Sequence, residues 1–195
     1  MAELTAQPTL VLVAGGPGAG KTAVGRALAA QFEQAVLLDK DVLNGIWVDA
    51  MLVRLNEGRI DRESRVYLDT LRPLEYAGLM AAALDNLVIG KWVFAIAPFG
   101  PELTDGEWVR RLKNAVHAQS GRLRAIWIEF DAETARERIV ARNEPRDAWK
   151  LANWETFIAQ SPFSAPRTDL FVLRSTADTT IADLVNKADI YLRLK

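Results

Sequence analysis

Five short apolar runs recur along the chain, and longer stretches with apolar residues at helical spacing separate them. The runs cover residues 9–14, 35–38, 92–97, 125–130 and 170–173. They do not alternate between apolar and polar residues, as the strands of a half-exposed sheet would. The pattern therefore predicts an α/β fold in which helices cover both faces of a parallel sheet. In such a fold the ligand binds at the carboxyl ends of the strands.

The stretches between these runs predict helices. The stretch 42–87 contains no convincing strand and indicates two or three helices, with Gly58 as a stop and Pro73 in a first helical turn. Further helices are expected over residues 21–32, from a cap at Thr104 to near Gly121, over 132–142 after a cap at Asp131, over about 147–160, and over 181–192.

Size and composition exclude several classes of protein. At 195 residues the chain suits one α/β domain, and 50% hydrophobic with 25% charged residues is typical of a globular protein. A net charge of −1 gives no global attraction for a polyanion, so no nucleic-acid partner is expected. The absence of cysteine excludes a disulfide framework and a thiol nucleophile.

The sequence also bears on location. The N-terminus lacks a signal-peptide pattern, and the apolar run 92–100 is too short to span a bilayer. We therefore expect a cytoplasmic protein with no membrane partner. The oligomeric state stays open.

The strongest chemical signal is the motif G-x-x-x-x-G-K-[ST], which lies between a predicted strand and a predicted helix. Its glycines let backbone N–H groups surround an anion, and Lys21 would reach the β- and γ-phosphates while the Thr22 hydroxyl binds Mg²⁺. The alternative is a glycine turn that only joins strand to helix. We expect ATP and Mg²⁺, with the nucleotide on Gly15, Gly16, Pro17, Gly18, Ala19, Gly20, Lys21, Thr22 and Ala23.

Two carboxylates, Asp39 and Asp41, flank Lys40 where the second predicted strand ends. In this fold that strand end lies beside the phosphate loop. One carboxylate could serve near the metal ion while the other accepts a proton from a hydroxyl. The alternative is that one of them only caps the next helix.

An arginine series follows the fourth predicted strand: Arg136, Arg138, Arg142 and Arg146. The last three are four residues apart, so a continuous helix would direct them to one spot, as a transferring phosphoryl group requires. The alternative is a solvated helix face on which the arginines pair with Glu133, Glu137 and Glu144.

Together these motifs resemble those of the P-loop small-molecule kinases. The resemblance rests on the phosphate loop, D-x-D after strand two, A-P-F at residues 97–99, and R-x-x-x-R-x-x-x-R-D followed by residues 149–154. This group includes shikimate and gluconate kinases, chloramphenicol phosphotransferase, zeta toxin and relatives known only as AAA-family ATPases. The resemblance spans nearly the whole chain, although only the phosphate loop is sharply specific. It implies one domain over 1–195 with strand order 2-3-1-4-5, an acceptor-binding helical region at 42–87 and a lid at 138–160.

The resemblance also implies roles for individual residues. Arg138 would lie against the adenine, and Arg142 or Arg146 would close onto the γ-phosphate. The loop after strand five, with Ser175 and Thr176, would follow the base.

In the acceptor region the resemblance makes Asp41 the base toward the acceptor hydroxyl. One departure concerns the metal ion, because relatives often end strand three with an aspartate where this chain has Ile96. No carboxylate lies anywhere from 92 to 97, so Asp39 is the nearest replacement, acting through water because Mg²⁺ keeps several of its waters.

Trp47, Arg72 and Tyr76 are candidates for the acceptor pocket, and the single histidine, His117, is expected at the surface or a helix end. The sequence thus predicts an ATP-dependent phosphotransferase acting on a hydroxyl of a small molecule such as an antibiotic, sugar or metabolite. A nucleoside or nucleotide kinase is one alternative. A nucleotide-binding regulator with weak ATPase activity, suggested by Ile96, is another.

Overall fold

The core of the protein is a five-stranded parallel sheet in the order β2-β3-β1-β4-β5. The computed structural model describes residues 7–160, 164–166, 169–176 and 178–194. The strands are β1 (Thr9–Gly15), β2 (Ala35–Asp39), β3 (Trp92–Ile96), β4 (Arg122–Glu129) and β5 (Phe171–Arg174). The predicted fold class and strand order are confirmed.

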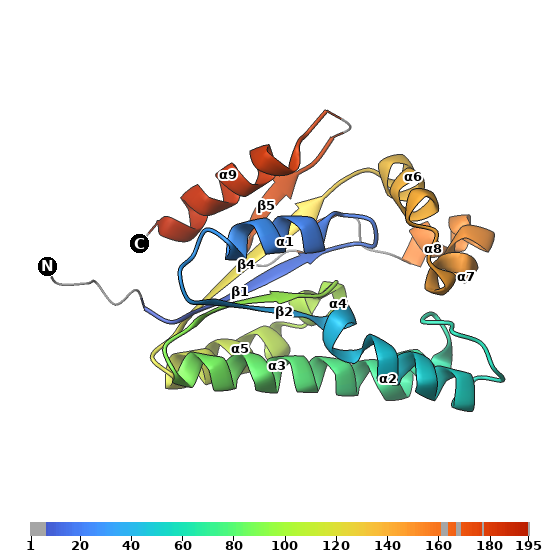
Figure 1. Ribbon diagram of the computed structural model, residues 1–195, viewed down its shortest axis with the longest axis horizontal. Helices are drawn as coiled ribbons and strands as arrows, with labels where there is room; N and C mark the ends of the chain where they lie inside the picture. Colours follow the sequence, from blue (N-terminus) through green and yellow to red (C-terminus); the bar gives the residue numbers. More distant parts are fainter. Residues whose placement is uncertain (1–6, 161–163, 167–168, 177, 195) are drawn as a thin grey trace, which may run out of the picture.

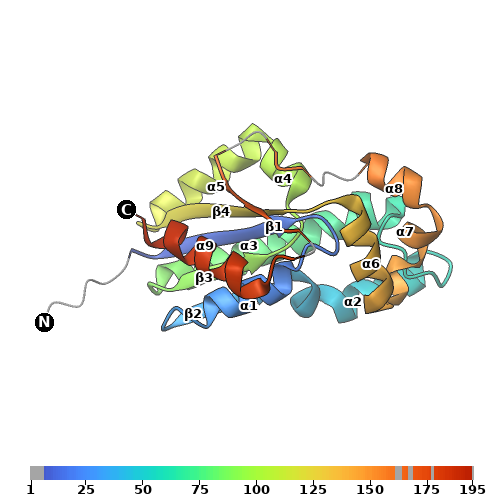
Figure 2. The ribbon, with the colours of Figure 1, turned by 90° about the horizontal axis from the view of Figure 1, so that it is seen from above.

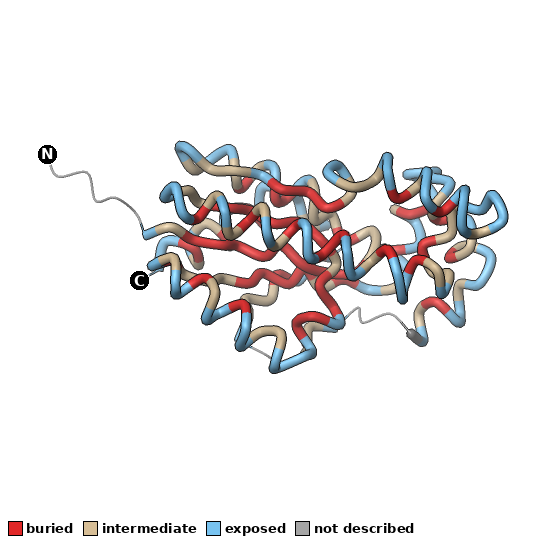
Figure 3. The backbone as a smooth tube through the Cα atoms, turned by 90° about the horizontal axis from the view of Figure 1, so that it is seen from below, coloured by how far each residue is buried: buried red, intermediate tan, exposed pale blue. Residues whose placement is uncertain are grey.

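Helices cover both faces of this sheet (Figure 1). Successive side chains of β1 point to opposite faces, so Leu10 and Leu12 pack with α3 (Arg72–Val88) and α5 (Gly106–Ala118). Val11 and Val13 pack with α1 (Lys21–Ala29) and α9 (Ile181–Arg193) on the other face. The central strands β1 and β3 are accordingly buried along most of their length, whereas the edge strands β2 and β5 are only partly buried (Figure 3).

The predicted helical region after β2 is confirmed. It contains α2 (Lys40–Leu55), a π-helical turn η1 (Tyr67–Leu71) and α3, which has Pro73 in its first turn. A small apolar cluster joins α2 to η1: Val48, Leu52, Tyr67 and Leu71. This cluster fixes α2 beyond the edge of the sheet, where the main core does not reach.

Three predicted boundaries were wrong. Asp105, not Thr104, caps α5, because Thr104 ends the unpredicted helix α4 (Gly100–Thr104) and its hydroxyl donates to the Gly100 carbonyl. Strand β4 begins at Arg122, before the predicted start, because Arg122 and Arg124 donate to the last carbonyls of α9 and so lie in the strand despite their charge. Helix α1 ends at Ala29, before the predicted end.

A fourth error concerns the arginine series and the segment that follows it. Asp131 caps α6 (Ala132–Arg142) as predicted, but Asn143 adopts a left-handed conformation and ends the helix. The continuous helix predicted over 147–160 is instead a short 3₁₀ turn η2 (Pro145–Asp147), then α7 (Ala148–Ala152) and α8 (Trp154–Gln160). We call residues 132–160 the α6–α8 segment.

The α6–α8 segment and α2 both lie at the end of the sheet to which the strands point, and the chain between α2 and α3 passes between them (Figures 1 and 2). None of the helices in the described residues is long and apolar enough to cross a membrane. The carboxyl ends of the strands therefore face a space bordered by two groups of helices.

Candidate active site

The phosphate loop turns sharply between β1 and α1. Gly15 and Gly18 have φ angles of 140° and 81°, and a Cβ on Gly15 would lie 2.6 Å from the Ile128 carbonyl oxygen. The first turn of α1 has no side-chain cap, so its N–H groups are available to an anion. Lys21 Nζ donates to the Gly16 carbonyl at 2.8 Å, which holds the lysine across the loop.

Lys21 lies in a desolvated position. Burial lowers its pKa to about 8, against the opposing effect of Asp41. Phosphate oxygens would supply negative charge at this point. The loop thus has both the backbone geometry and the cation that a nucleotide triphosphate requires.

Asp39 performs two tasks at the end of β2. Its Oδ1 accepts from the Asp41 backbone N–H at 2.9 Å and caps α2, while its Oδ2 accepts from the Thr22 hydroxyl at 2.8 Å. Among the described residues no group of three or more His, Cys, Asp or Glu side chains could hold a metal ion. A hydroxyl and a carboxylate side by side fit Mg²⁺, which takes its other ligands from phosphates and water.

The position of Ile96 explains why β3 carries no carboxylate. Ile96 pairs in register with Asp39, is buried, and packs against α1 so closely that a Cβ on Gly25 would lie 2.5 Å from its Cδ1. A carboxylate there would be surrounded by apolar side chains. Asp39 is therefore the acidic group next to Thr22.

Asp41 is surrounded by cations from three parts of the chain. Its carboxylate contacts Lys40 Nζ at 2.9 Å, Arg62 Nη1 at 3.1 Å and Arg146 Nη1 at 2.6 Å. Burial alone would raise the pKa of Asp41, but Lys40, Arg146 and Arg62 outweigh it and hold this pKa well below its usual range. Asp41 is thus an ionised hydrogen-bond acceptor close to Lys21.

Sequence reasoning missed the buried group beneath Asp41. Lys40 Nζ lies 3.2 Å from both oxygens of Glu75, and the Tyr67 hydroxyl donates to Glu75 Oε2 at 2.6 Å. Arg62, also missed, donates to Asp49 at 2.9 Å besides Asp41. Their charges are separated by many residues in the sequence, so no local spacing indicates them.

The structure brings together only two of the three predicted acceptor residues. The Arg72 guanidinium lies 4.2 Å from the Tyr76 ring centroid and forms two hydrogen bonds with Glu102, and the Phe99 N–H donates to Tyr76 Oη at 3.4 Å. Trp47 is 37% exposed on α2 and donates to Asn44 Oδ1. The structure therefore brings Arg72 and Tyr76 together near the end of β3, and Trp47 is in contact with neither.

The arginines do not line one helix face, because α6 ends at Arg142. Arg138 donates to the Gly18 carbonyl at 3.3 Å and to Ser175 Oγ at 3.4 Å, joining the phosphate loop to the loop after β5. Arg142 pairs with both oxygens of Asp147 at 2.8 and 2.7 Å. The ion pairs of Arg142 and Arg146 are therefore with Asp147 and Asp41. Among the described residues neither arginine forms an ion pair with Glu133, Glu137 or Glu144, which was the alternative interpretation.

The surroundings of these arginines complete the site. Lys150 Nζ lies 3.5 Å from Asp147 and 3.3 Å from Glu63, which joins α7 to the chain between α2 and α3. The Ser175 N–H donates to the Glu129 carbonyl, and the Thr176 N–H to Thr179 Oγ1. The loop after β5 is thus held beside the phosphate loop.

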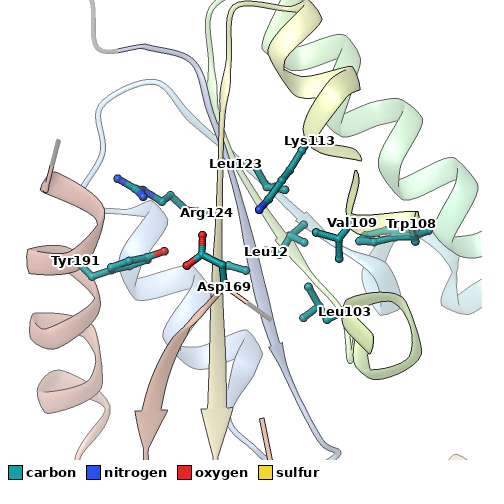
Figure 4. Close-up of a pocket in the computed structure, with 10 residues that line it drawn as sticks. Leu12, Leu103, Trp108, Val109, Lys113, Leu123, Arg124, Asp169 and Tyr191 are labelled. Carbon is teal, nitrogen blue, oxygen red and sulfur yellow. The ribbon is translucent and has the colours of Figure 1, made fainter. Parts of the chain in front are cut away.

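A small hollow of about 30 Å³ lies elsewhere, over β1 and β4 between α5 and α9 (Figure 4). Trp108 and Lys113 of α5 face Arg124 and Tyr191 across it. None of the residues assigned to the candidate active site lines this hollow. His117, at the last turn of α5, is exposed as expected.

Comparison with known proteins gives one family and many similar folds. A family model described as an AAA domain matches residues 10–162, which is most of the chain. No curated protein matches it.

Three solved structures are similar to this chain. A proposed kinase from Chloroflexus aurantiacus j-10-fl has a TM-score of 0.66 and 22% identity, covering 97% of this chain and 100% of its own. A sugar kinase from Janibacter sp. HTCC2649 has a TM-score of 0.62 and 14% identity, and the match covers 95% of this chain and 94% of that one. A gluconokinase from Sinorhizobium meliloti 1021 has a TM-score of 0.54 and 15% identity, and the match covers 97% of this chain and 98% of that one. At these identities the likeness establishes the P-loop kinase fold, and it confirms at that level the resemblance indicated by the motifs.

Proposed function

The chain belongs to the AAA domain family, and on that premise we propose that it is a kinase that moves the γ-phosphate of Mg·ATP to a hydroxyl of a small molecule. The observation that carries the proposal is the place of Asp41. Its carboxylate contacts Arg62 of the α2–α3 region and Arg146 of the α6–α8 segment, and it is close enough to affect the pKa of Lys21. An acceptor hydroxyl bound to Asp41 would lie between the phosphate loop and the arginines.

The nucleotide would occupy the phosphate loop, residues 15–23. Lys21 would neutralise the β- and γ-phosphates, while Thr22 and Asp39 would hold Mg²⁺ directly or through water. The bound metal ion supplies charge neutralisation of the phosphates. Arg138, with Ser175 and Thr176 nearby, would border the base.

Asp41 would orient the acceptor hydroxyl and accept its proton. Because phosphoryl transfer passes through a loose transition state, a carboxylate with a low pKa can take the proton late, after the bond to the leaving oxygen has weakened. Its main contribution would be the position of the attacking oxygen.

Residues 138–160 would act as a lid over this reaction. Arg142 and Arg146 are already directed toward carboxylates at the site, and exchange of those carboxylates for phosphate oxygens would stabilise the transferring group. Residues 42–87, with Arg72 and Tyr76, would hold the acceptor within the same domain.

A screen for ADP release over a panel of hydroxyl compounds tests the proposal. We expect ADP formation to depend on an acceptor, a phosphorylated product by mass spectrometry, and loss of both in Lys21→Ala, while His117→Ala serves as an exposed control. ADP formation that never depends on an acceptor would favour a regulator with weak ATPase activity. Activity of Lys21→Ala within about threefold of wild type would contradict the kinase proposal.

A further inference from the structure

Three cations near the proposed acceptor site, Lys40, Arg62 and Arg72, already have carboxylate partners. Arg72 donates to Glu102 Oε1 at 2.6 Å and Oε2 at 2.8 Å, so two donors of its guanidinium are occupied by one carboxylate. Its face is stacked on Tyr76. A carboxylate on an acceptor could reach Arg72 in this way only by displacing a bidentate partner that is itself buried.

The other two of these cations, Lys40 and Arg62, lie beneath carboxylates. Lys40 and Arg62 are only 4% and 7% exposed, whereas the Asp41 and Asp49 side chains that they contact are each 41% exposed. The surface offered to a ligand is therefore acidic, and the positive charges are behind it. A pocket that binds an anion would instead have its cations at the surface.

A count of charges agrees with this arrangement. Lys40, Arg62 and Arg72 together contact four carboxylates: Asp41, Asp49, Glu75 and, from α4, Glu102. Arg146 from the α6–α8 segment makes the set neutral. No cation of this set remains for an acidic ligand, and one more carboxylate would meet Asp41 and Asp49 at short range.

Unsatisfied donors show what the site lacks instead. Arg62 Nε, Arg146 Nε and Asn44 Nδ2 are buried N–H donors with no hydrogen-bond partner in the described part of the chain. Buried donors without a partner are costly, and an oxygen of a ligand could satisfy Arg62 Nε and Arg146 Nε once the two guanidiniums turn from Asp41 toward it. A hydroxyl accepts from such donors and donates to carboxylates such as those of Asp41 and Asp49, which an acidic group cannot do.

We propose that the acceptor is a polyhydroxylated molecule without an acidic group, uncharged or bearing an amine. This inference rests on the proposed kinase function and narrows its substrate class. Carboxylated and phosphorylated acceptors would be disfavoured by at least about tenfold in kcat/KM, because their charge meets carboxylates whose cations are already paired.

Matched pairs of compounds test the inference. Glucose and glucosamine would be compared with glucuronate, which differs mainly in an acidic group, by acceptor kcat/KM at saturating Mg·ATP and by calorimetric binding with a non-hydrolysable ATP analogue. We expect the uncharged or amine-bearing member to be preferred by tenfold or more in both measurements. Preference for the acid in either measurement would overturn the inference.

A change at Glu102 tests the physical cause. Glu102→Gln removes the charge that pairs with Arg72. We expect the ratio of kcat/KM for glucose to kcat/KM for glucuronate to fall about tenfold in this variant. Glu107→Gln makes the same change on α5, where Glu107 pairs with Arg110, and it should leave the preference unchanged. Should Glu102→Gln fail to fold, Asp49→Asn alters the exposed partner of Arg62 with the same expected direction. Equal shifts in Glu107→Gln and the site variants would contradict the inference.

The two proposals can fail separately. Binding of the uncharged compounds without any ADP formation supports the inference and contradicts the kinase function. Turnover of the acid in preference to its partners supports the kinase function and overturns the inference. Binding of neither kind of compound contradicts both.

Discussion

The charge of Lys21 depends on its surroundings. Burial lowers its pKa to about 8, which brings its loss of a proton into an accessible pH range. In the folded protein the ammonium form prevails below this pKa and declines above it. A ligand with phosphate groups binds the charged form, so nucleotide affinity and pH are linked at this position.

We therefore expect the Kd of the free protein for Mg·ATP to increase as pH rises through about 8. The proton lost from Lys21 removes the positive charge that the β- and γ-phosphates would contact. Calorimetric titrations between about pH 7 and 9.5 measure this directly. Lys21→Arg stays charged across that range and should lack the increase. A wild-type Kd that is constant over the range would show that Lys21 does not contact the phosphates.

Asp41→Asn should lower acceptor phosphorylation by about two to four orders of magnitude, the range for loss of a positioned proton acceptor. The affinity for ATP should change little, because the phosphate loop is intact. Single-turnover rates and nucleotide titrations separate the two quantities. If ATP affinity fell and the rate of transfer did not, Asp41 would belong to the nucleotide site.

Asp39→Asn should instead raise the Mg²⁺ concentration required for half-maximal activity. Its Oδ2 accepts a hydrogen bond from the Thr22 hydroxyl, so a change at Asp39 affects both groups proposed to hold the metal ion. Activity measured against Mg²⁺ at fixed ATP gives the result. Asp61→Asn, on the chain between α2 and η1, is a control carboxylate with a local role in its own turn. Reversed phenotypes of Asp39 and Asp41 would mean that their roles are exchanged.

At the scale of elements, ion pairs join the short helices of the α6–α8 segment, beside the buried side chains of Ile139 and Phe157. Arg142 pairs with Asp147, and Lys150 links Asp147 to Glu63. These contacts join short helices at a point where each helix is too short to be stable alone. Such segments open and close more readily than the sheet.

A non-hydrolysable ATP analogue with Mg²⁺ should therefore increase hydrogen-exchange protection over residues 138–155. In a variant that keeps only Trp149 and Trp154, the fluorescence should shift on binding. Arg142→Ala and Arg146→Ala should reduce both changes, and one of them should lower turnover by as much as about 10³-fold, as removal of an arginine supplied in cis does. Arg110→Ala on α5, whose partner is Glu107, is the control. Equal protection with and without nucleotide, together with full activity of both variants, would show that the segment is not a lid.

The sequence could predict those elements whose cause is local. The cap at Asp131 and the buried strands depend on neighbouring residues, and the structure confirms them. The end of α6 at Asn143 and the division of α7 from α8 depend on how this segment meets the rest of the protein. Local spacing could not reveal them. It suggested one helix face for Arg138, Arg142 and Arg146, but α6 ends at Arg142.

The same distinction applies to the candidate site. The phosphate loop and D-x-D are each contiguous in sequence. They meet as expected because β1 and β2 are parallel and end at the same edge of the sheet, with β3 between them. Pairs such as Lys40 with Glu75 and Arg72 with Glu102 join residues about thirty positions apart. Only tertiary packing brings them together, so their role in charge balance could not be predicted from spacing.

At the scale of the whole molecule, the position of the phosphate loop depends on how closely α1 lies against the sheet. Gly25 of α1 meets Ile96 of β3, and a Cβ at Gly25 would lie 2.5 and 2.9 Å from two carbon atoms of that side chain. The same Ile96 occupies the strand end where a carboxylate is absent. The close packing of α1 and the absence of a carboxylate at the end of β3 are thus two results of one residue.

Gly25→Ala should lower the free energy of unfolding by about 1–3 kcal/mol, because the added methyl group overpacks the contact with Ile96. Gly78→Ala is the matched control, since Gly78 lies in α3 with no atom within 4 Å of its added Cβ. That change should stabilise the protein by roughly 0.5–1 kcal/mol through the better helix propensity of alanine. Urea unfolding of the two variants measures the difference. A stabilising Gly25→Ala would show that the sheet and α1 are not in tight contact.

The contact between Arg146 and Asp41 makes the two substrates thermodynamically dependent on each other. Arg146 Nη1 lies 2.6 Å from Asp41, so an arginine drawn to a phosphate leaves this carboxylate freer to accept an acceptor hydroxyl. A hydroxyl that occupies Asp41 likewise frees Arg146 for the nucleotide. Linkage requires each ligand to raise the affinity for the other by the same factor. Without substrates the protein keeps Asp41 and Arg146 paired with each other, so binding of either substrate releases the group that the other substrate needs.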